Sequence, residues 1–195
     1  MANLNIDLLK ILTVADQKLF LWLNHQRHPW LDQLMPFLSD ERFIYAFFGL
    51  FAIIIVCSLR WRGLLLVALI WLLVLGSDFV CGKVLKPYFK RERPYLVLKE
   101  LFLYKEKRWQ FIKEPLSGQS YALPSCHATN VSCAASLFAF LMPRLGWLFW
   151  AFAAGVGYSR IYLGAHYPFD VLFGFLVGFL IAYLGRLLFV RLKLL

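Results

Sequence analysis

Three short runs of this sequence carry side chains that could bind, attack and release a phosphoryl group. They are Lys86 with Arg93 and Pro94, then Pro124-Ser125-Cys126-His127, and then Ser159 and Arg160 with His166 and Asp170. Together they offer cations for phosphoryl oxygens, two imidazoles for attack and proton transfer, and a carboxylate one helical turn after a histidine. Each run lies at one end of an apolar stretch, so we expect the substrate at a membrane surface.

The sharpest of these signals is the pair formed by His166 and Asp170. Pro168 suits the first turn of a helix, and Asp170 then lies one turn into an apolar helix, where an unpaired carboxylate is costly. A carboxylate that binds one ring nitrogen of His166 leaves the other nitrogen free to attack phosphorus. Arg160 adds a cation and Ser159 adds a hydrogen bond. The alternative is a purely structural His–Asp pair at a helix start.

Ser125 is the predicted N-cap of the apolar helix that follows it. The free N–H groups of Cys126 and His127 would then favour a bound anion, together with the helix dipole. His127 is placed to donate a proton to a departing oxygen. The plainer alternative is a helix cap beside an interfacial histidine.

Lys86 and Arg93 flank a basic run that also holds Lys90 and Arg91. A proline follows both Lys86 and Arg93, which favours a rigid, non-helical shape that aims these charges. Juxtamembrane basic runs also bind anionic lipid surfaces without specificity, and this is the alternative for the run taken alone.

The composition predicts an integral membrane protein. Of the 195 residues, 61% are hydrophobic and only 16% are charged, and the mean hydropathy is +0.66. The length suits one all-α membrane domain over residues 1–195. A net charge of +10 in so apolar a chain favours lipid headgroups and the bilayer as partners, and we expect no nucleic acid partner.

Five apolar stretches come close to the roughly 20 residues that a transmembrane helix needs. They cover about 43–59, 63–82, 126–142, 145–163 and 168–190. Residues 43–195 therefore form the predicted transmembrane core. Residues 1–40 show helical amphipathic spacing, which predicts an interfacial helix followed by a short interfacial piece at 30–38. The polar segment 83–123 is predicted to face the lipid headgroup, with a surface helix over 102–112.

Five spans would bring all three motifs to one face of the membrane. The 83–123 segment and the 159–168 turn would lie there together with residues 1–42. The opposite face would carry Arg60, Arg62, Arg144, Arg191 and Lys193, and no acidic residue. Short loops rich in Lys and Arg tend to be cytoplasmic, so we expect the motifs to face the periplasm or the cell exterior.

The set of motifs resembles the type-2 phosphatidic acid phosphatase and vanadium haloperoxidase superfamily. That family's pattern is Lys-x6-Arg-Pro, then Pro-Ser-Gly-His, then Ser-Arg-x5-His-x3-Asp. Ten of its eleven fixed positions match, at Lys86, Arg93, Pro94, Pro124, Ser125, His127, Ser159, Arg160, His166 and Asp170. Cys126 stands where the family has glycine. The membrane core looks like the lipid-phosphatase branch, of the bacterial undecaprenyl-diphosphate or lipid A 1-phosphatase type.

The resemblance implies a role for each matching residue. His166 would be the nucleophile that forms a phosphohistidine, Asp170 would orient it, and His127 would protonate the leaving group and then activate water. Lys86, Arg93, Ser125, Arg160 and the backbone at Cys126 would bind the phosphoryl oxygens. The reaction would need no metal and no cofactor, in a multi-pass protein of the bacterial inner (plasma) membrane.

The substrate and the acceptor stay open at this point. Candidate substrates are lipid A 1-phosphate, undecaprenyl diphosphate, phosphatidylglycerol phosphate and phosphatidic acid. The basic side chains of segment 95–115 favour a bulky or multiply charged headgroup. The phosphoryl group could pass to a second lipid instead of water. The protein could also bind or transport lipid phosphates without turnover, although a binder needs no positioned nucleophile.

Two smaller alternatives concern polar residues near the ends of the spans. Asp78 could pair with Lys83 or Lys86, or reach the interface alone. Cys81 and Cys126 could form a disulfide if their face is oxidising, or stay reduced.

Overall fold

The computed structural model describes the backbone of residues 2–192 and the side chains of residues 13–192. Its elements in chain order are α1 (Ala2–Asn24), α2 (Pro29–Leu38), α3 (Glu41–Phe79), η1 (Val80–Leu85), α4 (Lys86–Phe89), α5 (Pro94–Val97), β1 (Leu101–Lys105), β2 (Arg108–Ile112), α6 (Cys126–Leu141), η2 (Pro143–Leu145), α7 (Gly146–Tyr162) and α8 (Pro168–Arg191). The described chain is therefore mostly helical, as predicted, with one short hairpin.

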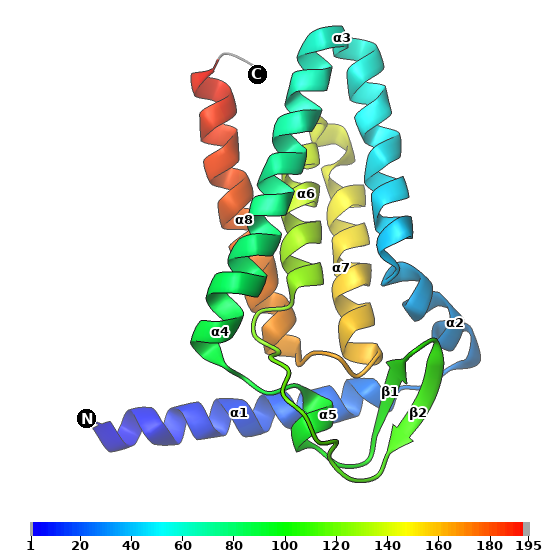
Figure 1. The fold of residues 1–195 in the computed structure, drawn as a ribbon, viewed down its shortest axis with the longest axis vertical. Coiled ribbons are helices and arrows are strands. Elements are labelled where there is room, and N and C mark those ends of the chain that lie inside the picture. The colour runs from blue at the N-terminus through cyan, green and yellow to red at the C-terminus, as the bar shows by residue number, and fades with distance from the viewer. Residues whose placement is uncertain (1, 193–195) are drawn as a thin grey trace.

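The long helices stand side by side as a bundle (Figure 1). Arg60 has a non-helical φ of 54° and ψ of −127°, which splits α3 into two limbs, 41–59 and 61–79, running in opposite directions. These limbs together with α6, α7 and α8 coincide with the predicted apolar stretches. By length and composition, the helical segment Glu41–Phe89, which contains both limbs, and α8 could cross a membrane, and α6 is a shorter apolar helix.

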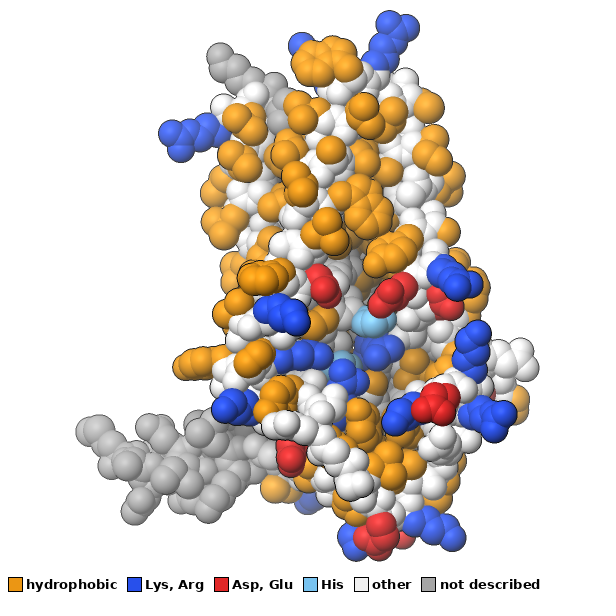
Figure 2. Space-filling model, viewed as in Figure 1, with side chains coloured by type: hydrophobic (Ala, Val, Ile, Leu, Met, Phe, Trp, Pro, Cys, Tyr) orange, Lys and Arg blue, Asp and Glu red, His pale blue; other side chains and the backbone are white. Residues whose placement is uncertain are grey.

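The bundle has an apolar body and one end rich in charged side chains of both signs, called the polar end below, whereas the opposite end of the described bundle carries only a few Lys and Arg side chains (Figure 2). Figure 2 shows hydrophobic side chains over the upper part of this face and a gathering of charged side chains around its lower part. The exposed apolar side chains lie on both limbs of α3 and on α8, and they include Leu50, Ile53, Leu64, Leu72, Leu176 and Leu184. Such a surface suits a hydrocarbon environment better than water.

The close contact between α6 and α8 depends on two glycines. A Cβ at Gly174 would lie 2.8 Å from the carbonyl oxygen of Ser125, and a Cβ at Gly178 would lie 2.1 Å from that of Thr129. Because these positions carry no side chain, α8 packs directly against the first turns of α6. This packing sets the distance between the start of α6 and Asp170 in the first turn of α8.

The N-terminal segment forms a helix, α1, that lies across the polar end of the bundle (Figure 1). Phe20 is buried against the protein, whereas Leu19 and Trp22 are 45% and 61% exposed. Asn24 at its end is buried and hydrogen-bonds backbone groups of β1 and α7. The side chains of residues 1–12, which belong to the predicted interfacial helix, lie outside the described residues.

The prediction of a surface helix over 102–112 is wrong, because this segment forms an antiparallel hairpin of β1 and β2. Glu106 and Lys107 have φ angles of 53° and 59°, the left-handed pair that a two-residue hairpin turn requires. Leu101 and Leu103 are buried while Phe102 and Tyr104 are less so, which is the alternation of a strand. The aromatic residues that suggested a lipid-facing helix also favour strands.

Candidate active site

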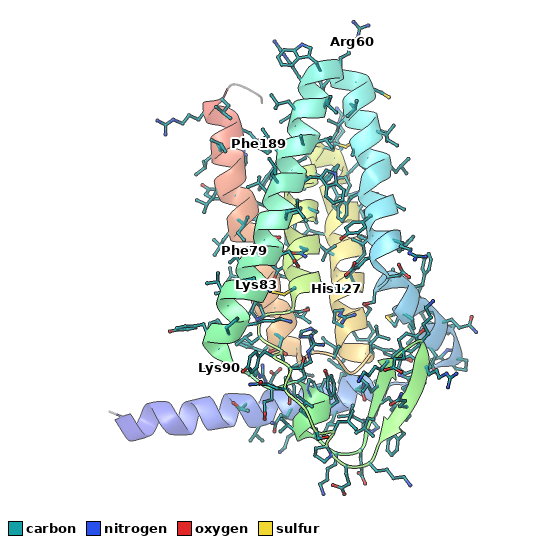
Figure 3. The ribbon with its side chains drawn as sticks, in the orientation of Figure 1. Arg60, Phe79, Lys83, Lys90, His127 and Phe189 are labelled. Carbon is teal, nitrogen blue, oxygen red and sulfur yellow. A yellow bond between two sulfur atoms is a disulfide. The ribbon has the colours of Figure 1, made fainter. Side chains whose placement is uncertain are left out.

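The three motifs meet at the polar end of the bundle. Lys86 opens α4, the second motif opens α6, and the third covers the end of α7, the loop after it and the first turn of α8. Figure 1 shows these helix ends together, and Figure 3 shows His127 among them, far from Arg60 at the other end.

The charged groups of the motifs are near enough to interact. Lys86 interacts electrostatically with Arg93 and Arg160. His127 interacts electrostatically with Arg160, His166 and Lys86. The fold therefore gathers the two imidazoles and the three cations around one site.

Ser125 occupies the predicted N-cap position of α6, but its hydroxyl makes no capping hydrogen bond. Its backbone N–H donates to the carbonyl oxygen of Asp170 at 3.0 Å, and its own carbonyl accepts from Thr129. The side chain is fully buried, and its Oγ has no hydrogen-bond partner among the described residues. The hydroxyl is thus free to donate to an oxyanion beside the first N–H groups of α6.

His166 is held by the turn that ends α7. Gly164 has a φ of 78°, which favours glycine, and the N–H groups of Ala165 and His166 both donate to the carbonyl oxygen of Arg160, at 3.1 and 3.2 Å. The Nδ1 atom of His166 lies 3.7 Å from Oδ2 of Asp170. The predicted pair is therefore close enough for electrostatic interaction, but the expected hydrogen bond between its two members is not formed.

The surroundings of His166 favour its neutral form. Burial lowers the pKa of His166 well below 6.5, and the positive charges of Arg93, Arg160 and Lys86 lower it further. The residue is only 2% exposed. His166 is therefore neutral near pH 7, the state in which a ring nitrogen has a lone pair available for attack.

Arg91 is a site residue that the sequence analysis did not identify. Its Nη1 lies 2.7 Å from Oδ1 of Asp170, and its Nη2 lies 2.6 Å from Oδ2 of Asp16 on α1. The other oxygen of Asp170 accepts the N–H of Tyr167 at 2.8 Å. Arg91 therefore fixes Asp170 and ties it to α1. The two partners are 79 residues apart, so no local spacing could indicate the contact.

The two other arginines of the site are anchored by residues outside the motifs. Arg160 donates through Nη1 to the hydroxyl of Ser39, the C-cap residue of α2, while its buried Nε has no partner among the described residues. Arg93 donates through Nε to the carbonyl oxygen of Tyr121 at 3.3 Å. These anchors orient each guanidinium, and Arg160 keeps an N–H available for a ligand.

A disulfide joins Cys81 in η1 to Cys126 at the start of α6, with the Cα atoms 5.6 Å apart. The two cysteines therefore pair, which was the oxidised alternative of the sequence analysis. Since its sulfur is bonded, Cys126 cannot act as a thiolate, and its backbone N–H is the group that it can offer to a ligand. The bond also ties the segment that leads to Lys86 to the segment that carries His127.

Known proteins are similar to this chain in sequence and in fold. Residues 63–193 match the PAP2 superfamily. The chain is 27% identical over 177 residues to the lipid A 4'-phosphatase of Bacteroides thetaiotaomicron, covering 88% of this chain and 75% of that protein. It is 30% identical over 179 residues to phosphatidylglycerophosphatase B of Bacillus subtilis, covering 82% and 76%.

A solved structure is also similar. The crystal structure of a transmembrane PAP2-type phosphatidylglycerolphosphate phosphatase from Bacillus subtilis has a TM-score of 0.65 and 25% sequence identity, and the match covers 90% of this chain and 85% of that chain. The family match runs from the second limb of α3 to the end of α8 and includes all three motifs. By its sequence, its fold and the residues gathered at its polar end, this chain belongs to the PAP2 superfamily.

Proposed function

We propose that this lipid phosphatase removes the terminal phosphate of a membrane lipid phosphate or diphosphate, without a metal, through a phosphohistidine on His166. One observation carries the proposal. Four buried side-chain nitrogen or oxygen atoms of the described residues lack a hydrogen-bond partner, and three of them are Ser125 Oγ, Arg160 Nε and His166 Nδ1. His166 Nδ1 faces Asp170 at 3.7 Å, which leaves Ser125 Oγ and Arg160 Nε. Buried polar groups are rarely left unpaired, so these two free donors from different motifs indicate a pocket built for a polar ligand.

In the first step, a ring nitrogen of His166 attacks phosphorus while the bond from phosphorus to the lipid oxygen breaks. His127 gives its proton to that oxygen, so a monoester leaves as an alcohol. The imidazole of His166 becomes positively charged in the phosphohistidine. Asp170, 3.7 Å from that ring, stabilises the charge.

In the second step, water replaces the lipid. His127, now neutral, takes a proton from the water, and the water oxygen attacks phosphorus. The nitrogen–phosphorus bond breaks, inorganic phosphate leaves and His166 is neutral again. Lys86, Arg93 and Arg160 stabilise the negative charge on the phosphoryl oxygens in both steps.

We further propose that the two limbs of α3 with α6, α7 and α8 make five spans of a bacterial inner membrane, with the site on the periplasmic or outer side. The disulfide between Cys81 and Cys126 supports this orientation, because disulfides persist in oxidising compartments. The opposite end carries Arg60, Arg62 and Arg144 in short turns, as cytoplasmic loops do.

The test is phosphate release by the purified protein in detergent micelles. Lipid A 1-phosphate, undecaprenyl diphosphate, phosphatidylglycerol phosphate and phosphatidic acid are compared side by side. His166→Ala should abolish release from every lipid that the unmodified protein hydrolyses, because the nucleophile is lost. His25→Ala, which removes an exposed histidine outside the motifs, should leave release unchanged.

A labelled substrate tests the intermediate and the acceptor. Rapid quenching should trap an acid-labile, base-stable label on the unmodified protein and none on His166→Ala. The label should then appear as free phosphate, whereas its appearance on a second lipid would indicate phosphotransfer. Full phosphate release by His166→Ala would refute the proposed nucleophile.

A further inference from the structure

A cavity of about 370 Å³ lies between the two limbs of α3 and α6, and His127 forms part of its wall. Each wall is polar at the site end and apolar beyond it. From the site end inward, the first limb of α3 contributes Glu41, Ile44 and Phe48. The second limb contributes Asp78, Val74 and Ile70 in the same order. Helix α6 contributes His127, Val131 and Phe138. The cavity therefore starts beside the proposed proton donor and continues into the apolar body of the bundle.

Two carboxylates flank the entrance of this cavity. Glu41 is the first residue of α3, and Asp78 lies in the last turn of the same helix, on the other limb. Tyr45 interacts electrostatically with both carboxylates, and all three residues line the cavity. Figure 2 shows acidic side chains on both sides of a histidine where this face is hollowed.

Neither carboxylate forms an ion pair among the described residues, so Asp78 does not pair directly with Lys83 or Lys86. Two site cations act on them from beyond ion-pair distance, Arg160 on Glu41 and Lys86 on Asp78. Asp78 accepts instead from Nδ2 of Asn130 at 2.8 Å, and the Oδ1 of that asparagine accepts from Ser77 at 2.8 Å. Both residues are exposed, so each carboxylate is accessible to a ligand that enters the cavity.

We propose that the cavity receives the leaving group of the substrate, and that Glu41 and Asp78 select an uncharged leaving group with hydroxyl or amide N–H donors. A phosphomonoester of a lipid-linked sugar has such a leaving group. A prenyl diphosphate does not, because its leaving group is an anionic prenyl phosphate. This inference rests on the proposed function, because in that mechanism His127 protonates the departing oxygen. The leaving group must then lie on the side of the site next to His127.

The selectivity follows from the charges and from the shape of the cavity. An ionised carboxylate only accepts hydrogen bonds, so the hydroxyl and amide N–H groups of a sugar can pair with Glu41 and Asp78. A second phosphate at the same position would be repelled by both carboxylates. The apolar walls beyond them would take the hydrocarbon chains of the lipid, which stay buried as the phosphoryl group leaves.

The experiment compares kcat/KM for two probes in the same detergent, diacylglucosamine 1-phosphate and farnesyl diphosphate. The unmodified protein should prefer the sugar phosphate. Glu41→Gln, Asp78→Asn and the double variant remove charge at nearly constant shape. The double variant should shift the ratio of the two kcat/KM values toward the diphosphate by at least about tenfold. Added salt should raise diphosphate hydrolysis by the unmodified protein more than by the double variant.

Asp40→Asn is the matched control. It removes one carboxylate next to Glu41 but outside the cavity lining, and asparagine still caps α3. It should leave the ratio unchanged. If Asp78→Asn does not fold, Glu41→Gln by itself tests the proposal, because the side chain of Glu41 forms no hydrogen bond or ion pair among the described residues and lies on the same cavity.

The outcomes separate this inference from the proposed function. An unchanged ratio in the folded variants, or an equal loss on both probes, would overturn the selectivity while His166-dependent phosphate release stands. A preference of the unmodified protein for the diphosphate would overturn it as well. Phosphate release from neither probe nor from any other lipid phosphate would instead count against the function itself.

Discussion

The two ends of the helix bundle hold their arginines in different ways. At the polar end, Arg91 is paired with carboxylates, including that of Asp170, and Arg160 is bonded to a buried serine hydroxyl. At the opposite end, no described arginine forms an ion pair, and Arg62 and Arg186 lie over aromatic rings. Both ends are basic, but only one of them fixes the position of its charges.

This difference indicates what each set of cations does. Desolvating a charge is costly, and a buried ion pair is retained where its geometry matters more than its net stability. Exposed cations in short turns need no fixed geometry to orient a chain in a membrane. Substitutions at the polar end should therefore change catalysis, while equivalent substitutions at the opposite end should not.

The largest contrast is expected between Arg91→Ala and Arg62→Ala. Loss of Arg91 leaves one oxygen of Asp170 without its partner, so kcat should fall by about 10- to 100-fold, as for other groups that orient a reactive residue. KM should change little. Arg91→Lys should recover only part of the activity, since an ammonium group cannot bridge both carboxylates in the same plane. Steady-state kinetics on one lipid phosphate measures all three variants.

Two outcomes would contradict this assignment. If Arg91 only binds anionic lipid surfaces, its loss should raise KM and leave kcat unchanged. An effect of the same size from Lys90→Ala, the exposed neighbour in the basic run, would lead to the same conclusion.

A smaller contrast concerns the cysteines. Cys81→Ser removes a bond that closes a sequence separation of 45 residues, which should destabilise the fold by on the order of 4 kcal/mol. Cys57→Ser, near the opposite end, removes a free thiol and should have no such effect. Thermal unfolding in detergent, with and without reductant, measures both. Insensitivity of the unmodified protein to reductant would indicate that the disulfide adds little stability.

The smallest expected effect is on the pH dependence of activity, because groups at the polar end change the pKa of His166. Its pKa is lowered below 6.5 by burial and by Arg93, Arg160 and Lys86. Because the neutral ring attacks, activity should persist as the pH falls to about 6, where a histidine of ordinary pKa would lose roughly fourfold. Arg93→Gln should move the acid limb of the pH profile of kcat/KM to higher pH, whereas Arg186→Gln should not.

The same pKa shift bears on stability. A folded-state pKa below that of the unfolded chain means that the unfolded chain binds the proton more tightly. The contribution of His166 to stability should therefore decrease as the pH falls through about 6.5.

For the kinetic prediction, an acid limb of the kcat/KM profile that already begins above pH 6.5 would contradict a neutral His166 at pH 7.

Much of the candidate site could be predicted from the sequence, because its signals are local. The spacing of His166 and Asp170, the position of Ser125 before an apolar helix and the lengths of the apolar stretches are all properties of short segments. The hairpin at 101–112 was missed, although its turn and its alternation are also local, since aromatic residues suit a membrane-surface helix as well as a strand.

Residue types and their spacing were enough to predict an apolar helical scaffold and to single out His166 with Asp170 as a candidate reactive pair, because one helical turn brings two such residues together. The partnership of Arg91 with Asp170, the bond between Cys81 and Cys126 and the pair of carboxylates at the cavity join residues tens of positions apart. Such contacts depend on how the helices pack, which no single segment of the sequence specifies.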